Sequence, residues 1–327
     1  MKILILGGTK FLGRHLVDAA LADGHDVTLF NRGKTNPGLF PGVEQLHGDR
    51  DGNLEALANG TWDVVIDTSG YVPRVVRASA ELLKPRTKKY VFISSISVYA
   101  DFDVEDIDEN YPVGQVDDPT TEDVQAFYGP LKALCEQAVQ DVYGDQALII
   151  RPGLIVGPND PTDRFTYWVR RFGQGGDVLV PGRPQRLQQF IDVRDLAEWT
   201  VRAAVSPLTG VFNATGPAER FTMGELVQEI QATVPGAGKP VWVGEEFLAQ
   251  HEVAEWSEMP LWIAESHGWP GFEAANIDRA KQAGLTFRPV AETVRDTWAW
   301  DKDRAGAMVA GMDAKREADL LKEWAQR

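Results

Sequence analysis

The hydrophobic residues of the first half of the chain form short continuous runs, and segments with helical spacing separate these runs. We predict helices after the first run and near residues 74–83 and 126–142. We predict strands over Ile3–Leu6, Asp26–Phe30, Val43–His47, Trp62–Ser69, Tyr90–Ser94 and Ala147–Ile150. Continuous apolar strands that alternate with helices are typical of a parallel sheet buried on both faces. The sequence therefore predicts a doubly wound parallel α/β fold for residues 1–152.

The pattern changes after residue 152, where glycine and proline become frequent and tryptophans accumulate. We expect residues 153–327 to form mainly a second, smaller lobe whose tryptophans pack in its core. Two strand-like segments near residues 189–216, Phe190–Val193 and Val211–Ala214, are expected to rejoin the first sheet. Residues Asp301–Arg327 are predicted to form a terminal amphipathic helix, with apolar positions at Met308, Met312, Leu320, Leu321 and Trp324.

Charge and cysteine content narrow the function classes. The 327 residues carry 33 basic and 48 acidic side chains, and their net charge of -15 would repel phosphate backbones, so we expect no nucleic-acid partner. The single cysteine, Cys135, excludes a disulfide framework, and no histidine has the spacing of a metal ligand, so no metal site is predicted. We interpret the acidic segment Asp101–Asp123 as a solvated loop. No apolar run approaches the ~18 residues that span a membrane, so we expect a cytoplasmic protein with no membrane contact.

A glycine-rich turn follows the first predicted strand and precedes a helix. Its sequence is Gly7-Gly8-Thr9-Lys10-Phe11-Leu12-Gly13. The free N–H groups and the helix dipole at such a turn bind phosphate, as in dinucleotide sites, although a tight turn without a ligand is the alternative. Lys10 replaces the middle glycine of the usual motif and supplies a cation. The candidate cofactor residues here are Gly7, Thr9, Lys10, Phe11, Leu12 and Gly13.

The end of the second strand bears on which dinucleotide would bind. A carboxylate there hydrogen-bonds a ribose 2′-hydroxyl, whereas an arginine accommodates a 2′-phosphate. This chain has Asn31-Arg32 and no acid, so we predict NADP in preference to NAD, with Arg32 as a solvated loop residue the alternative. Asp49 and Arg50 end the third strand, where an adenine ring would lie, although turn chemistry explains Asp49 as well. Two strand-end residues complete the candidate set: Ser69 and Pro152.

A second group of residues has the chemistry of a proton relay. Ser95 follows the fifth strand, and Tyr128 and Lys132 have the i, i+4 spacing that places them on one helical face. An ammonium beside a phenol lowers the phenol's pKa from its reference value of ~10. A serine hydroxyl at the strand end can hydrogen-bond the same substrate oxygen. These three residues are therefore the candidate catalytic set for a hydroxyl–carbonyl interconversion.

With these motifs, the sequence resembles the extended, atypical short-chain dehydrogenase/reductases of the NAD(P)-dependent epimerase/dehydratase family. The resemblance implies a Rossmann fold in which Tyr128 is the acid/base, Lys132 clamps the cofactor ribose and Ser95 polarises the substrate. It also implies that the second lobe binds a small-molecule substrate and that the chain forms a homodimer. The matching segments are Gly7–Gly13, Ser94–Tyr99, Tyr128–Lys132, Arg151-Pro152, Gly157-Pro158, Phe190–Leu196 and Val211–Gly216.

The departures from this family concern the substrate. Dehydratases carry Asp-Glu where this chain has Ile96-Ser97, and nucleotide-sugar enzymes often carry Asn where this chain has Leu154. Their Arg-Asp pair is replaced by Gln188-Gln189, although Arg186 is close enough in sequence to substitute. Pro130 lies between the tyrosine and the lysine, so we expect the helix to begin nearer the tyrosine than usual.

Three functions follow. The leading hypothesis is an NADP(H)-dependent oxidoreductase that interconverts a secondary alcohol and a ketone on a small, sugar-like molecule. The second is a nucleotide-sugar epimerase with tightly held NAD. The third is a catalytically quiet cofactor-binding or RNA-binding relative, against which the intact Ser95, Tyr128 and Lys132 count.

Overall fold

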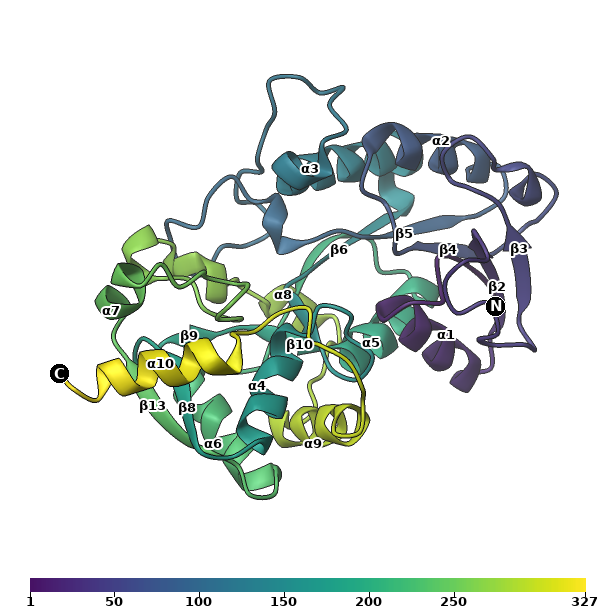
Figure 1. Cartoon of the computed structure of the whole chain (residues 1–327). Coiled ribbons are helices and arrows are strands. Elements are labelled where there is room, and N and C mark those ends of the chain that lie inside the picture. Colours follow the sequence, from purple (N-terminus) through teal and green to yellow (C-terminus); the bar gives the residue numbers. More distant parts are fainter.

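The computed structural model describes residues 1–327, and a seven-stranded parallel sheet forms the centre of its first half (Figure 1). The strand order is β11-β6-β5-β4-β1-β2-β3, which is the order of a Rossmann sheet. Its strands are β1 (Lys2–Leu6), β2 (Asp26–Asn31), β3 (Glu44–His47), β4 (Val64–Asp67), β5 (Lys89–Ile93), β6 (Ala147–Pro152) and β11 (Gly210–Ala214).

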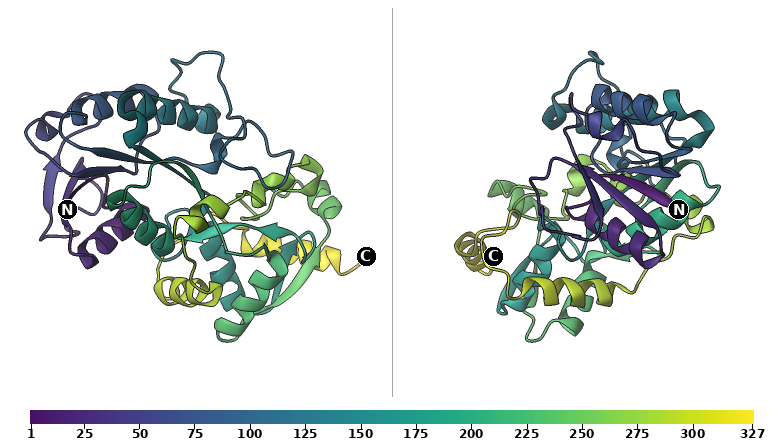
Figure 2. Two further views of the ribbon diagram at one scale, coloured as in Figure 1. Left: turned by 180° about the vertical axis from the view of Figure 1, so that it is seen from behind. Right: turned by 90° about the vertical axis from the view of Figure 1, so that its right-hand side faces the viewer.

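Helices cover both faces of this sheet, as Figures 1 and 2 show. Helices α1 (Leu12–Ala22) and α5 (Val193–Val205) lie on one face, and α2 (Pro73–Leu83) and α3 (Val124–Tyr143) lie on the other. The middle strands are buried from end to end because both faces are covered. The predicted doubly wound fold is confirmed.

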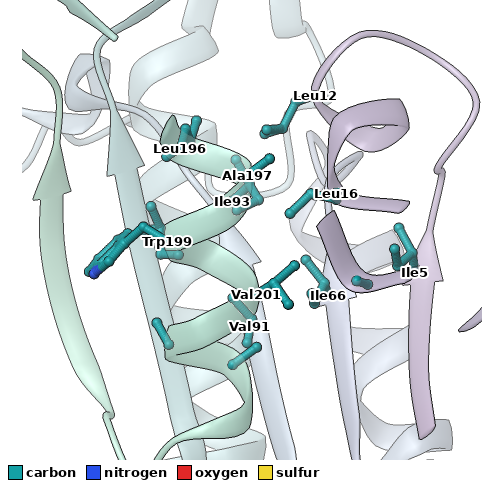
Figure 3. Close-up of a cluster of buried hydrophobic side chains, with 14 of the residues drawn as sticks. Ile5, Leu12, Leu16, Ile66, Val91, Ile93, Leu196, Ala197, Trp199 and Val201 are labelled. Atoms are coloured by element: carbon teal, nitrogen blue, oxygen red, sulfur yellow. The ribbon is translucent and has the colours of Figure 1, made fainter. Parts of the chain in front are cut away.

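The two faces bury separate hydrophobic cores. On one, Leu12 and Leu16 of α1 face Ala197 and Val201 of α5 above the strands, whereas Trp199 points away from α1 (Figure 3). On the other, α2 and α3 pack against the sheet, and Cys135 of α3 is fully buried there. Each large apolar side chain buried in this way stabilises the fold by roughly 1.5–3 kcal/mol.

The two segments expected to rejoin the sheet behave differently. Val211–Ala214 does so, because β11 pairs in parallel with β6 at the edge of the sheet. The expectation for Phe190–Val193 is wrong: β10 (Phe190–Asp192) pairs with β7 (Leu154–Val156) in a separate two-stranded sheet. The edge beside β6 is occupied by β11, and β10 lies beside β7 instead.

The remaining elements form a lobe of helices and short two-stranded sheets around Trp168 and Trp262, which are buried. Strand β13 pairs in parallel with β8, and β12 pairs antiparallel with β9. The elements are α4 (Arg164–Gly173), β8 (Asp177–Pro181), β9 (Leu187–Gln188), β12 (Phe221–Thr222), α6 (Met223–Thr233), β13 (Lys239–Val243), α7 (Glu245–Gln250), α8 (Asp278–Gln282), α9 (Val290–Asp301) and α10 (Ala314–Trp324). Short 3₁₀ turns are η1 (Glu55–Leu57), η2 (Ile96–Val98), η3 (Gly144–Gln146), η4 (Glu265–His267) and η5 (Pro270–Glu273).

The terminal helix is shorter than predicted. Residues Asp301–Arg327 do not form one helix: α9 ends at Asp301, and α10 begins only at Ala314. Between them Gly306 and Gly311 adopt φ of +105° and +118°, which end any helix. Asp313 then caps α10 by accepting hydrogen bonds from two backbone N–H groups.

The acidic segment Asp101–Asp123 forms no helix or strand, and most of its acidic side chains are exposed. It is the long loop that leads into α3 in Figure 1. The tryptophans are not uniformly core residues, since Trp269 is 44% exposed. No helix in this chain has the length and apolar character to cross a bilayer.

Candidate functional site

The glycine-rich turn has the backbone shape of a phosphate site. Gly7 and Gly8 adopt φ of +117° and +95°, and a Cβ on Gly13 would lie 2.7 Å from the Gly8 amide nitrogen. The amides of Thr9 and Phe11 have no acceptor within the chain, and no side chain caps the start of α1. Free N–H groups at a helix N-terminus fit the pyrophosphate of a dinucleotide.

The loop after β2 folds back on this turn. The Asn36 side chain donates to the Thr9 carbonyl at 2.8 Å, and the Asn31 side chain accepts from the Gly33 amide at 2.7 Å. Lys10 and Arg32 are both exposed on these two joined loops. The structure therefore brings the two predicted cations into neighbouring loops beside the turn.

Arg50 is engaged within the protein. Its guanidinium binds the fully buried Asp67 through two nitrogens, at 2.6 and 2.7 Å. The Tyr90 hydroxyl donates to the same carboxylate at 2.8 Å, and burial holds the pKa of that phenol well above its usual range. This cluster (Arg50, Asp67 and Tyr90) ties the loop after β3 to the carboxyl end of β4 and to the beginning of β5. No sequence motif had singled out Asp67 or Tyr90.

The other predicted cofactor residues lie at strand ends. Asp49 pairs with Asn53 through two backbone hydrogen bonds, the turn geometry that we gave as its alternative explanation. Ser69 lies two residues beyond the end of β4, and its amide donates to Asp67 at 3.0 Å. Pro152 ends β6 opposite Ala214 of β11. Cofactor binding by these residues and by Arg50 stays a prediction.

The start of α3 sets the position of Tyr128. Asp123 caps the helix by accepting from the Ala126 amide at 3.1 Å, but Phe127 departs from helical geometry with φ of −126°. Regular helix resumes at Tyr128, so Pro130 falls in the first regular turn, where a missing N–H is tolerated. We expected such a displaced start from the proline.

Ser95, which follows β5, lies close enough to Tyr128 to act on its phenol. Ser95 is itself held by Ser97, whose amide donates to its hydroxyl at 3.1 Å. Burial raises the pKa of the Tyr128 phenol, and the nearby Ser95 only partly opposes the rise. The expected lowering by Lys132 is therefore wrong for this structure, because that ammonium is bound elsewhere.

Lys132 is almost fully buried, at 3% exposure. Its ammonium donates to the carbonyls of Gly70 and Ile93, at 2.8 and 2.6 Å, and lies 4.2 Å from the centre of the Phe92 ring. Burial lowers its pKa to about 8. An ammonium has three donors, so one remains for a further acceptor, such as a ribose hydroxyl.

Gly129 is a site residue that sequence reasoning missed. A Cβ there would lie 2.0 Å from the Ser97 carbonyl oxygen, so only glycine lets α3 approach η2 this closely. That approach is what brings Tyr128 to Ser95. A glycine beside the tyrosine carries no signal of this contact in the sequence, because its partner is some thirty positions earlier.

On the substrate side, Arg186 is not free. Its guanidinium donates to the Ile263 carbonyl and lies 3.7 Å from Glu245. Gln189 is tied in the same way, with its side chain exchanging two hydrogen bonds with the Ala275 backbone at 2.9 and 3.0 Å. Arg186 and Gln189 therefore brace the lobe, and the expected substitution by Arg186 is not supported.

The chain matches one family model and several known proteins. Residues 56–214 match the model described as the NAD dependent epimerase/dehydratase family. The chloroplast stem-loop binding protein of 41 kDa b from Arabidopsis thaliana is 28% identical over 212 residues, which are 60% of this chain and 53% of that protein. The chain thus spans about half the length of this relative. The 2-alkyl-3-oxoalkanoate reductase of Stenotrophomonas maltophilia is 28% identical over 258 residues, which are 72% of this chain and 76% of the reductase.

Solved structures share the fold over nearly the whole chain. The UDP-glucuronic acid 4-epimerase from Bacillus cereus, determined in complex with NAD, matches with a TM-score of 0.68 at 17% identity. The match covers 94% of this chain and 99% of that one. At this identity the likeness shows the fold alone.

Proposed function

Because this chain belongs to the NAD dependent epimerase/dehydratase family, we propose that it is an enzyme that uses a nicotinamide dinucleotide to interconvert a secondary alcohol and a ketone on a small molecule. The observation that carries the proposal is the position of Tyr128 and the buried ammonium of Lys132 one turn apart on α3, which packs closely against η2 next to Ser95. A bound nicotinamide supplies or accepts the hydride at the substrate carbon.

The residues of the chain handle the proton. In the reductive direction the neutral phenol of Tyr128 gives its proton to the carbonyl oxygen as the hydride arrives, so the ketone becomes an alcohol. Ser95 donates a hydrogen bond to the same oxygen and fixes its position. Lys132 would hold the cofactor ribose with its third donor.

We further propose that NADP(H) is preferred. Asn31 ends β2 where a carboxylate would hydrogen-bond a 2′-hydroxyl, and Lys10 and Arg32 are exposed on the two loops beside it. Two cations and no acid favour a 2′-phosphate. The relation to an oxoalkanoate reductase supports a catalyst that exchanges its cofactor at each turnover.

A nucleotide-sugar epimerase is the second candidate, favoured by the structural likeness to a sugar-nucleotide epimerase that holds NAD. The two are separated by denaturing the freshly purified protein and identifying any released nucleotide by mass spectrometry. Stoichiometric NAD would favour the epimerase, because a self-recycling enzyme keeps its cofactor. An empty site that binds NADPH at least tenfold tighter than NADH is the result we expect, whereas a site that binds neither would overturn both candidates.

Tyr128→Phe tests the proton relay. Removing the hydroxyl should lower the rate by ~10²–10⁴-fold on any substrate found by screening ketones with NADPH. Tyr71→Phe is the matched control, since its ring lies 6.4 Å from that of Tyr128 yet it has no part in the relay. Near-normal turnover by Tyr128→Phe would contradict the assignment.

A further inference from the structure

Arg164, the first residue of α4, is a partly buried cation that the protein leaves unpaired. Its guanidinium lies 5.2 Å from the centre of the Trp256 ring. It makes no hydrogen bond or ion pair with any group of the chain, and its nitrogens keep access to solvent. Partial burial of an unpaired charge costs free energy, so a group that accepts from it would be stabilising.

The other arginines of the same helix show that this is unusual. Arg170 binds Asp301 through two nitrogens at 2.6 Å each, and Arg171 pairs with Glu317 at 2.5 Å. Both use a carboxylate more than a hundred residues away in sequence. Arg164 has no such partner. It is the first residue of α4 and directly follows the loop of residues 157–163.

That loop is fixed at both ends. The Arg14 side chain of α1 donates to the Asn159 side chain at 3.1 Å, and the His15 ring hydrogen-bonds the Pro158 carbonyl at 3.1 Å. At the other end Asp163 adopts φ of +58° and pairs with Arg304 at 2.5 Å. The backbone that carries the unpaired guanidinium is therefore anchored to the cofactor half and to the lobe.

Arg164 is close enough to Tyr128 for the two side chains to interact electrostatically. Its charge acts on Tyr128, where it opposes the rise in the phenol's pKa that burial causes. The charge of the nearby Asp160 acts on Arg164, but its carboxylate hydrogen-bonds the amide and hydroxyl of Thr162, both at 2.8 Å, and makes no direct contact with the guanidinium. Aromatic rings continue away from this point, with Trp256 at 5.3 Å from Phe272, and Phe272 at 5.1 Å from Phe102.

We propose that Arg164 binds an anionic oxygen group of the substrate, a carboxylate or a phosphate, while the reacting carbonyl lies at Tyr128. A planar guanidinium matches such groups with two hydrogen bonds, and Trp256 holds it in place from one side. This inference rests on the proposed function, since it assigns the substrate class of that same site. It predicts an oxo acid or a phosphorylated ketone, with any apolar part lying along the aromatic rings.

Matched pairs of probes test this by calorimetry on the full-length protein saturated with NADP⁺, the oxidised cofactor, which cannot reduce the ketone probes. One pair is acetoacetate and its methyl ester, and the other is dihydroxyacetone phosphate and dihydroxyacetone. In the unmodified protein the charged member of one pair should bind at least about tenfold tighter than the neutral one, and which pair responds distinguishes carboxylate from phosphate. No preference for either charged probe would overturn the proposal.

Variants locate the effect. Arg164→Gln should abolish the preference without changing affinity for the neutral probes, and Arg164→Lys, which keeps the charge, should retain part of it. Arg202→Gln, at an exposed arginine of α5, is the matched control and should leave the preference unchanged. A preference that survives Arg164→Gln would overturn the proposal.

The same titrations separate this inference from the proposed function. NADPH binding, measured first, should be the same within about twofold in all of these proteins, since none of the changes lies at the glycine-rich turn. Failure of the unmodified protein to bind NADPH would count against the proposed function alone. The charged-probe preference, measured again without cofactor, would still decide whether Arg164 is an anion site.

Discussion

The two halves of the molecule bury charged groups in different ways. In the sheet half, the Asp67 carboxylate at the end of β4 accepts hydrogen bonds from Arg50 and Tyr90, and Lys132 donates only to backbone carbonyls. In the C-terminal lobe, buried carboxylates such as Asp301 pair with arginines and join helices that no sheet connects. Buried charged groups therefore position the carboxyl edge of the sheet in one half, whereas in the other half they connect helices that no sheet joins.

Asp67→Ala should have the largest effect on stability. It leaves the Arg50 guanidinium buried and unpaired, so we expect a loss of about 3–5 kcal/mol in the free energy of unfolding by urea. Asp51→Ala is the control, because its pair with Arg74 is exposed and should contribute nothing measurable. Equal losses in the two variants would contradict the importance given to the buried cluster.

Asp301→Ala is the matching change in the lobe. It removes the partner of both Arg170 and Arg304, but these side chains are 17% and 29% exposed and regain water. The expected loss is about 1.5–3 kcal/mol, measured by the same urea titration. A loss larger than that of Asp67→Ala would reverse the comparison between the halves.

Gly129→Ala tests the close approach of α3 to η2. A Cβ there must push against the Ser97 carbonyl, so we expect about 1–3 kcal/mol of destabilisation, and the shift of Tyr128 from Ser95 should lower the reaction rate as well. Gly42→Ala is a suitable control because nothing lies within 4 Å of its Cβ position. Unchanged stability and rate in Gly129→Ala would remove this glycine from the site.

The smallest effect concerns pH. Burial lowers the pKa of Lys132 to about 8, below its unfolded value, so between these values the unfolded chain binds more protons and stability rises with pH. From pH 8 to 9.5 the unmodified protein should gain about 1–2 kcal/mol relative to Lys132→Met. Subtracting the variant removes the contribution of Lys89, whose pKa burial also lowers to about 8. A flat difference would show that the carbonyls keep Lys132 charged throughout.

Most of the sheet half could be predicted from sequence because its central strands β1, β4, β5 and β6 consist mainly of consecutive apolar residues. The glycine-rich turn and the Tyr128–Lys132 spacing are likewise local patterns. The lobe could not be predicted in the same way, since Arg170 and Arg171 depend on Asp301 and Glu317, far along the chain. Within the site, the residues that were not predicted, Asp67, Tyr90 and Gly129, owe their role to a contact with a residue distant in sequence.

The segment expected to rejoin the sheet shows the same limit. Phe190–Asp192 has the composition of a buried strand, and it is one, but composition does not say which edge it joins. The terminal helix failed for a local reason, because Gly306 and Gly311 interrupt an otherwise helical pattern of apolar residues. The division of the chain at residue 152 stays a prediction.

The burial of Cys135 allows the opening of α3 to be measured by thiol labelling. This thiol, the only one in the protein, is fully buried one helical turn beyond Lys132, and burial raises its pKa to about 12. A thiol reagent can reach it only while α3 is lifted from the sheet. The labelling rate of the native protein therefore counts how often the helix that carries Tyr128 opens, without any added probe.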